Sequence, residues 1–419
     1  MDRLHLVFLF FSIFLPTTSK ADASDQKGMT WHIKEIPHIV TSDVVHLNSP
    51  KFEAEPKLEL HGTCGIECQK NMPPPTLSEL ESYLSFETVY ENGTRTMTKV
   101  NVQTWLPGGF NQSNTKERHN LRRKRQVYGT DSRFSISDRH FMTNYPFSTA
   151  VKLSSGCSGI LISPKHVLTA AHCVHDGTDY IKNAKKLRVG ILKIKTKRGG
   201  KRHKGSKKNR EGMSDDEDTP KKEGKKQRRK SVQKRSAADV EQTNSKSSMS
   251  GKPSFGWTRV KAIQIPKGWI KDVSKNMTLD YDYAVLELKR TQKKKYMDLG
   301  ISPEVNKMPG SRVHFSGFDE DRPGELVYRF CSVSVESNDL FYQYCDAEPG
   351  SSGSGIYIRL KEPNKKKWNR KIVAIYSGHQ WVETGDEQQD YNVAVRITPL
   401  KYAQICLWIH GSNSACSQG

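Results

Sequence analysis

Long hydrophobic runs are almost absent from this sequence of 419 residues. The one exception is residues 4–15, which follow Arg3 and give way to a polar segment at residues 16–20. A membrane-spanning helix needs about 20 apolar residues, so this run is too short to cross a bilayer. A basic residue, a short apolar stretch and a polar end are typical of a secretory signal peptide. We therefore predict a signal peptide at residues 1–20, no membrane span, and a secreted, extracellular mature chain.

Acidic side chains are scarce relative to basic ones. The chain carries 67 Lys and Arg against 45 Asp and Glu, a formal net charge of +22. Residues 191–252 hold 21 of the basic side chains, 8 of the acidic ones and almost no large apolar ones. Such a segment cannot bury enough surface to offset the entropy lost on ordering. We predict a disordered basic insertion that binds heparin-like polyanions. Nucleic acid would suit the same charge, but the signal peptide argues against that partner.

Regular alternation of strands and helices is also lacking, which argues against a parallel α/β fold. The second part of the chain instead consists of short β-rich runs broken by Gly, Pro and Asp. These runs lie at residues 159–162, 166–169, 283–288, 312–315, 355–358 and 371–376. Spaced strands of this kind indicate an all-β sandwich or barrel. Near the C-terminus, residues 399–409 have the apolar spacing of a helix.

The segment at residues 21–125 contains few strand-like runs. Its clearest local signal is Thr76 followed by Glu79, a capping box ahead of a short helix. The rest is polar and gives no periodic pattern. We predict one short helix and much extended, poorly ordered chain.

This segment ends in four consecutive basic residues at 122–125. A flexible cationic run suits the acidic cleft of a furin-like convertase, and a solvated charge run is the alternative. The change of composition after the run favours cleavage, between Arg125 and Gln126. Residues 21–125 are then a pro-region, and residues 126–419 form the main domain, interrupted by the basic insertion.

Cysteine occurs in an even number, 8. In the oxidising secretory pathway these residues are expected to form disulfides. A metal site at Cys64 and Cys68 is the alternative, but two remote cysteines left over in a secreted chain favour disulfides. Three sequons without a central proline, at Asn92, Asn111 and Asn276, mark expected glycosylation sites.

Three separated residues have the types needed for nucleophilic catalysis. His172 lies at the end of an apolar strand and is followed by a cysteine. Asp282 comes just before a second apolar strand, and Ser352 lies in a Gly-rich turn after Gly350. Each alone has a common structural explanation: a core histidine, a turn acid, a flexible linker. Together, in this order within one β-rich domain, they indicate a catalytic triad. The backbone N–H groups of Gly350 and Ser352 would converge as an oxyanion hole.

These residues resemble the trypsin-like serine protease superfamily, above all in the run Leu168 to Cys173. The resemblance covers residues 126–419 and implies two six-stranded β-barrels with a C-terminal helix. It implies that His172 is the general base, Asp282 its orienting acid and Ser352 the nucleophile. It also implies the disulfides Cys157–Cys173 and Cys331–Cys345, a protein or peptide substrate, and no cofactor or metal. The pairing of Cys64, Cys68, Cys406 and Cys416 stays open.

Two residues depart from the family pattern. Its zymogens usually release an apolar N-terminus that pairs with an Asp before the nucleophile, whereas this chain has Gln126 and Ser351. Substrate preference also stays open, because Asp346 would suit a basic side chain and His379 an acidic one. Mammalian members most like this chain are regarded as inactive. The sequence therefore leaves two functions: a secreted serine endopeptidase acting through Ser352, or an inactive homologue that binds extracellular matrix or glycosaminoglycan.

Overall fold

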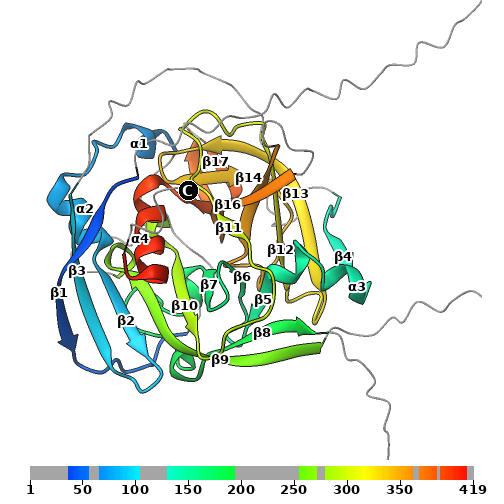
Figure 1. The fold of residues 1–419 in the computed structure, drawn as a ribbon. Helices are drawn as coiled ribbons and strands as arrows, with labels where there is room; N and C mark the ends of the chain where they lie inside the picture. Colours follow the sequence, from blue (N-terminus) through cyan, green and yellow to red (C-terminus); the bar gives the residue numbers. More distant parts are fainter. Residues whose placement is uncertain are drawn as a thin grey trace, which may run out of the picture.

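The computed structural model describes residues 36–55, 66–103, 130–193, 254–270, 279–361, 368–384 and 387–412. Within these residues, two sheets close into two six-stranded antiparallel β-barrels, which confirms the predicted all-β fold (Figure 1). None of the described helices is both long and apolar enough to cross a membrane. Several predicted features lie outside the described residues: the signal peptide, the processing site at Arg125 and Gln126, the sequons at Asn111 and Asn276, and Cys64 and Cys416.

The first barrel is a ring in which β9 pairs with both β8 and β10, and β7, β6 and β5 complete the circle. Its strands are β5 (Ala150–Leu153), β6 (Ser158–Leu161), β7 (His166–Thr169), β8 (Arg188–Lys193), β9 (Ser254–Pro266) and β10 (Ala284–Leu288). The long strand β9 pairs with three neighbours: β8 and β10 within the ring, and β2 outside it.

The second barrel closes through pairing of β16 with both β15 and β17. Its strands are β12 (Arg312–Gly317), β13 (Leu326–Glu336), β14 (Leu340–Gln343), β15 (Gly355–Lys361), β16 (Trp368–Thr384) and β17 (Glu387–Arg396). Two short strands attach outside the ring: β4 (Phe134–Ile136) to β13 and β11 (Asp298–Leu299) in parallel to β16. A short helix, α3 (Arg139–Met142), follows β4.

The predicted basic insertion is the connection between β8 and β9. These two strands pair directly, with Lys193 opposite Ser254. The boundary predicted at residue 191 is wrong, because Ile191 and Leu192 are buried residues of β8. Their apolar side chains belong to the barrel, and the connection begins after Lys193.

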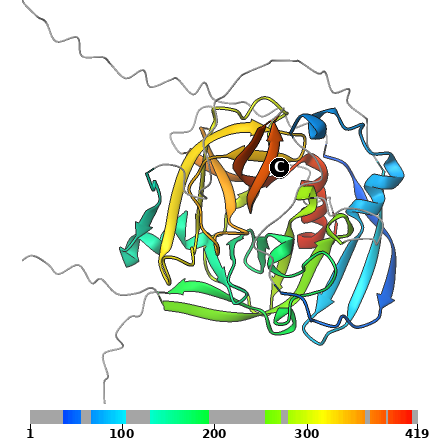
Figure 2. The ribbon, with the colours of Figure 1, turned by 180° about the vertical axis from the view of Figure 1, so that it is seen from behind.

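The described part of the predicted pro-region differs most from the expectation of a poorly ordered segment. It contains α1 (Ile66–Asn71), α2 (Leu77–Leu84) and three strands, β1 (Ile39–Leu47), β2 (Phe86–Tyr90) and β3 (Arg95–Val102). The capping box at α2 is confirmed, since Thr76 and Glu79 exchange both hydrogen bonds. The strands extend the first sheet in the order β1, β3, β2, β9 (Figure 2). Sequence reasoning missed them because their buried partners lie far along the chain.

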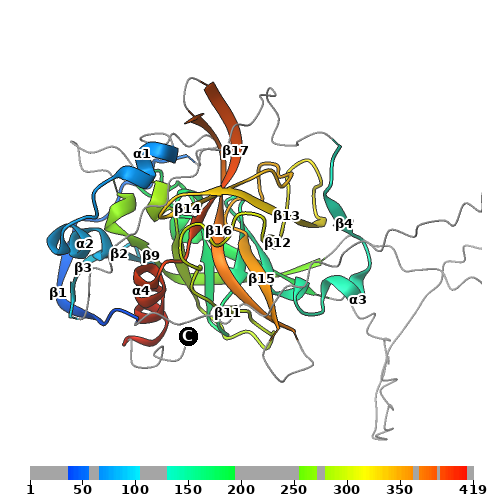
Figure 3. The same ribbon diagram turned by 90° about the horizontal axis from the view of Figure 1, so that it is seen from above.

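The C-terminal helix α4 (Pro399–His410) is present as predicted. It begins at the N-cap Thr398, has a proline in its first turn, and ends at Gly411, whose φ of 73° is left-handed. The pro-region packs against it: the Phe86 and Trp408 rings meet edge to face at 5.5 Å. In Figures 1 and 3, α4 lies beside the pro-region elements, at the end of the molecule opposite α3 and β4.

Candidate active site

The candidate catalytic histidine and acid come from neighbouring strands of the first barrel. His172 lies in η2 (Ala171–Cys173), just after β7, and Asp282 follows η5 (Leu279–Tyr281), just before β10. The two strands are antiparallel, with Ala284 opposite Thr169, so these ends meet. Asp282 Oδ2 accepts a hydrogen bond from His172 Nδ1, and Asp282 Oδ1 accepts one from His172 N, both at 2.8 Å.

Ser377 is a third partner of this acid that the sequence analysis missed. Its hydroxyl, from β16 of the second barrel, donates a hydrogen bond to Asp282 Oδ2. The Asp282 side chain is fully buried, and Ser377 is 1% exposed. Because a buried carboxylate needs hydrogen-bond donors, these bonds satisfy the Asp282 oxygens and hold the side chain in place. An Nδ1 that donates to Asp282 leaves Nε2 as the acceptor, the tautomer that a general base requires.

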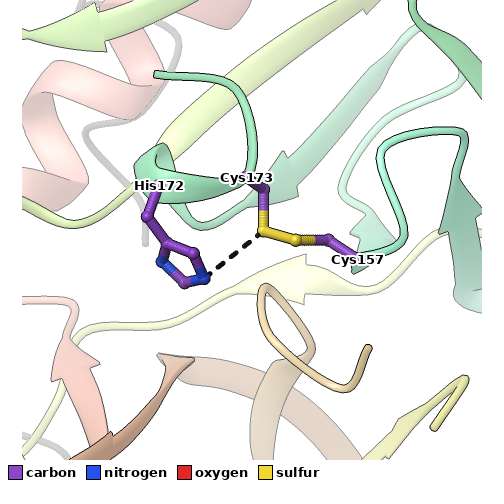
Figure 4. Close-up of side chains that lie close together, drawn as sticks. All are labelled: Cys157, His172 and Cys173. Atoms are coloured by element: carbon purple, nitrogen blue, oxygen red, sulfur yellow. Dashed lines mark hydrogen bonds between the residues drawn. A yellow bond between two sulfur atoms is a disulfide. The ribbon is translucent and has the colours of Figure 1, made fainter. Parts of the chain in front are cut away.

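The disulfide Cys157–Cys173 packs against the free edge of the imidazole ring. Its sulfurs are 2.10 Å apart, and Cys173 Sγ lies 3.7 Å from His172 Nε2 (Figure 4). A disulfide sulfur carries no hydrogen, so this contact is packing that limits rotation of the ring. Cys157, His172 and Cys173 lie close enough together to suggest a metal site. The two cysteines are joined in a disulfide, however, so neither offers the thiolate that would bind a metal ion.

The candidate nucleophile, Ser352, lies in a turn that requires glycine on both sides. Gly350 and Gly353 have φ values of +96° and +82°, which side chains rarely adopt. A Cβ at Gly350 would come within 2.5 Å of Phe318 O, and one at Gly353 within 2.2 Å of Thr169 Oγ1. Among the hydrogen bonds of the described residues, none uses the backbone N–H of Gly350 or Ser352. Both donors therefore remain available for an oxyanion.

Ser158 connects this turn to the first barrel and was also missed. Its N–H donates to Ser352 O at 2.8 Å, and its hydroxyl donates to Gly350 O at 2.7 Å. The same hydroxyl accepts from Phe318 N at 2.8 Å. Ser158 is fully buried beside the disulfide. Its neighbour in sequence, Cys157, was the only signal that could have drawn attention to it.

The nucleophile and the base share the same sulfur as a neighbour. Cys173 Sγ lies 3.8 Å from Ser352 O as well as 3.7 Å from His172 Nε2. The described residues include no hydrogen bond between Ser352 Oγ and Nε2. In serine hydrolases without substrate this bond is often long and shortens in the complex.

Ser351 and the two candidate specificity residues each have a partner in the structure, whereas Gln126, the other departure from the family pattern, lies outside the described residues. Ser351 is fully buried, and its hydroxyl donates to Glu348 O at 2.6 Å. Asp346 accepts hydrogen bonds from Ser132, and the Nε2 atom of His379 contacts the Asp390 carboxylate. Neither of the two candidate specificity residues is thus a free charge.

Other predicted sites can be placed as follows. Cys331 and Cys345 form the second disulfide, with Cα atoms 5.2 Å apart. Cys68 and Cys406 are disulfide-bonded as well. Asn92 is exposed in the turn between β2 and β3, where its side chain accepts a hydrogen bond from Thr94 N at 3.0 Å.

Two closed antiparallel barrels that bring His172, Asp282 and Ser352 to their junction define the class of the trypsin-like serine proteases. In agreement, the Trypsin family model matches residues 137–266.

Curated relatives cover nearly the whole chain. "Inactive serine protease 35" of Macaca mulatta is 59% identical, over 99% of this chain and 100% of that protein. "Serine protease 23" of Homo sapiens is 46% identical, over 99% of this chain and 98% of that protein. A solved structure of a Glu endopeptidase in complex with MPD is similar at 17% identity and a TM-score of 0.39, covering 67% of this chain and 97% of that one. The chain belongs to the serine protease 35 and 23 family of trypsin-like serine proteases.

Proposed function

We propose that this protein is a secreted serine endopeptidase that forms an acyl-enzyme through Ser352. The observation that carries this proposal is the geometry of the base: Asp282 and Ser377 fix the His172 ring so that Nε2 accepts a proton. A serine in a glycine turn and two unused N–H donors complete the requirements for acyl transfer.

The reaction follows from this arrangement. Ser352 Oγ attacks the carbonyl carbon of a peptide bond, and its proton moves to His172 Nε2 as the new C–O bond forms. The N–H groups of Gly350 and Ser352 bind the oxygen that becomes negative, and the buried Asp282 stabilises the imidazolium. The proton then passes to the leaving amine, and water repeats the sequence to release the acid.

A second candidate function is supported by two other observations. The relatives most similar in sequence include proteins named inactive, and residues 191–252 carry a large excess of basic side chains. An inactive homologue could bind glycosaminoglycans through this insertion. Labelling with a fluorophosphonate probe separates the two functions, because only a serine activated by a base reacts quickly.

Processing gives the first prediction. Replacing Arg122 and Arg125 with Ala should abolish cleavage by a furin-like convertase, because the convertase binds these two cationic side chains. Reducing gels of secreted protein should then show a larger species than the parent does. Lys124→Ala is the control and should be cleaved. Equal migration of the double variant and the parent would place the boundary elsewhere.

The basic insertion gives the second prediction. Deleting residues 201–246 should greatly lower the salt concentration at which the protein elutes from heparin, because most of the segment's cationic charge is lost. Folding should be unchanged, because the deletion leaves the paired strands β8 and β9 intact. A deletion variant that elutes with the parent contradicts the polyanion-binding role. A scrambled insertion of the same composition is the control, since charge rather than sequence is expected to matter.

A further inference from the structure

The segment just after the predicted processing site contacts the loops of the second barrel through a buried arginine. Arg133 is 8% exposed, and each of its five N–H groups points to a carboxylate oxygen. Nη1 donates to Asp319 at 2.8 Å and to Asp321 at 3.0 Å, while Nη2 donates to Asp321 at 2.7 Å. Nε and Nη2 also donate to Asp131. Because every N–H of this planar guanidinium donates a hydrogen bond to a carboxylate, its orientation is fixed.

The buried acid in this cluster is shared by two arginines. Asp319 is fully buried and also accepts hydrogen bonds from Arg329, which is itself fully buried. Two guanidinium groups offset the cost of removing this carboxylate from water. At the edge of the cluster, hydrogen bonding to Arg133 lowers the pKa of Asp131 to about 2. Asp131 therefore stays ionised over the physiological pH range.

The loop that carries Asp319 contacts the oxyanion hole directly. Glu320 N donates to Pro349 O at 2.7 Å, and Phe318 O lies against Gly350 so closely that a Cβ would clash. A trans peptide has its N–H opposite its C=O. Binding Pro349 O on one side thus fixes the direction of the Gly350 N–H on the other.

The same segment holds the chain before the nucleophile at a second point. Ser132 N and Ser132 Oγ donate to Asp346 Oδ2 at 2.7 and 2.6 Å. Asp346 is 1% exposed, and only a few residues separate it from Gly350. The Ser351 position offers no carboxylate to an ammonium group, because its side chain is a bound hydroxyl.

We propose that Arg133 is a positioning residue for this site, an internal cation that holds the 318–321 loop against Gly350. The oxyanion hole is then preset before any cleavage at Arg125. An ammonium group released at Gln126 is not required. This inference rests on the proposed function, because it concerns how the same site is made ready.

The test compares Arg133→Gln with Arg396→Gln. Arg396 is a control of the same type, a buried arginine that donates to Ser337 O and Pro303 O, away from the Gly350 turn. Losing one oxyanion donor costs about 100-fold or more in rate, so the Arg133 variant should react with a fluorophosphonate about 100-fold more slowly. Arg133→Lys keeps the positive charge but loses the planar guanidinium with its several N–H donors. Its labelling rate should lie between those of the parent and of Arg133→Gln. The control should label at the parent rate even if its melting temperature drops.

Amide hydrogen exchange supplies a readout that does not depend on activity. Peptides covering residues 346–356 should exchange faster in Arg133→Gln than in the parent, and no faster in Arg396→Gln. The uncleaved Arg122→Ala, Arg125→Ala variant should label as fast as cleaved protein.

Three results decide the matter. Labelling that appears only after cleavage overturns the proposal, and so does unchanged exchange in Arg133→Gln. If even the parent fails to label while exchange in Arg133→Gln increases, the positioning role is supported and the proposed catalytic function is contradicted.

Discussion

Replacing Ser352 with Ala should abolish fluorophosphonate labelling and reduce peptide cleavage by several orders of magnitude. The nucleophile, the base and the oxyanion donors act as a unit, so loss of one of them removes most of the rate enhancement. Cleavage of a diverse peptide library by purified protein, before and after the substitution, measures this effect.

Ser354→Ala is the matched control, because it removes a hydroxyl from the same turn. The Ser354 hydroxyl is buried and has no hydrogen-bond partner, so its loss should leave activity within about a factor of three of the parent. Activity that survives in Ser352→Ala comes from a contaminant or another residue. A parent protein that neither labels nor cleaves would favour the inactive homologue.

Deleting residues 36–103 should prevent recovery of folded, secreted protein. The deletion removes β2 from the edge of β9, where residues Phe86 to Tyr90 pair with Ala262 to Pro266. It also uncovers apolar side chains that share one core with the first barrel and α4. Each buried side chain of this kind contributes about 1.5–3 kcal/mol. The summed contribution of several such side chains exceeds the free energy of unfolding of a typical domain, roughly 5–15 kcal/mol.

Point substitutions keep this prediction testable when the deletion variant yields no protein. Phe86 is 6% exposed and contacts Trp408, so Phe86→Ala should cost about 3–5 kcal/mol and clearly lower the melting temperature. Val44 is 56% exposed on β1, and Val44→Ala should change stability by less than about 0.5 kcal/mol. A Phe86→Ala protein as stable as the Val44→Ala protein would show that the pro-region is dispensable for folding.

The packing of the predicted pro-region against the rest of the chain also limits what cleavage at Arg125 would do. Gln404 Nε2 donates to Leu84 O, and Lys267 N donates to Ser85 O at 2.6 Å, so backbone groups join the two parts of the chain. Cleavage at Arg125 would leave this interface intact. The cleaved pro-region should therefore co-elute with the protease domain in size-exclusion chromatography, and elution as a separate peptide would contradict this.

The sequence by itself determined six strands of the two barrels, the C-terminal helix and the candidate triad, because these depend on local patterns. Apolar alternation, turn residues and the Thr76 capping box are signals within a few neighbouring residues. The order of His172, Asp282 and Ser352 was visible because each has its own short motif. These patterns also predicted the barrel class through resemblance.

Only the tertiary structure decided the partners that come from distant strands. Ser377, Ser158 and Arg133 are common residue types in ordinary surroundings, and their roles depend on contacts across 95 to 192 positions of sequence. The strands of the predicted pro-region were missed for the same reason, since β2 joins the sheet by pairing with the distant β9. A hydrogen bond or buried contact between remote segments leaves no local periodicity, because folding brings the partners together independently of their spacing.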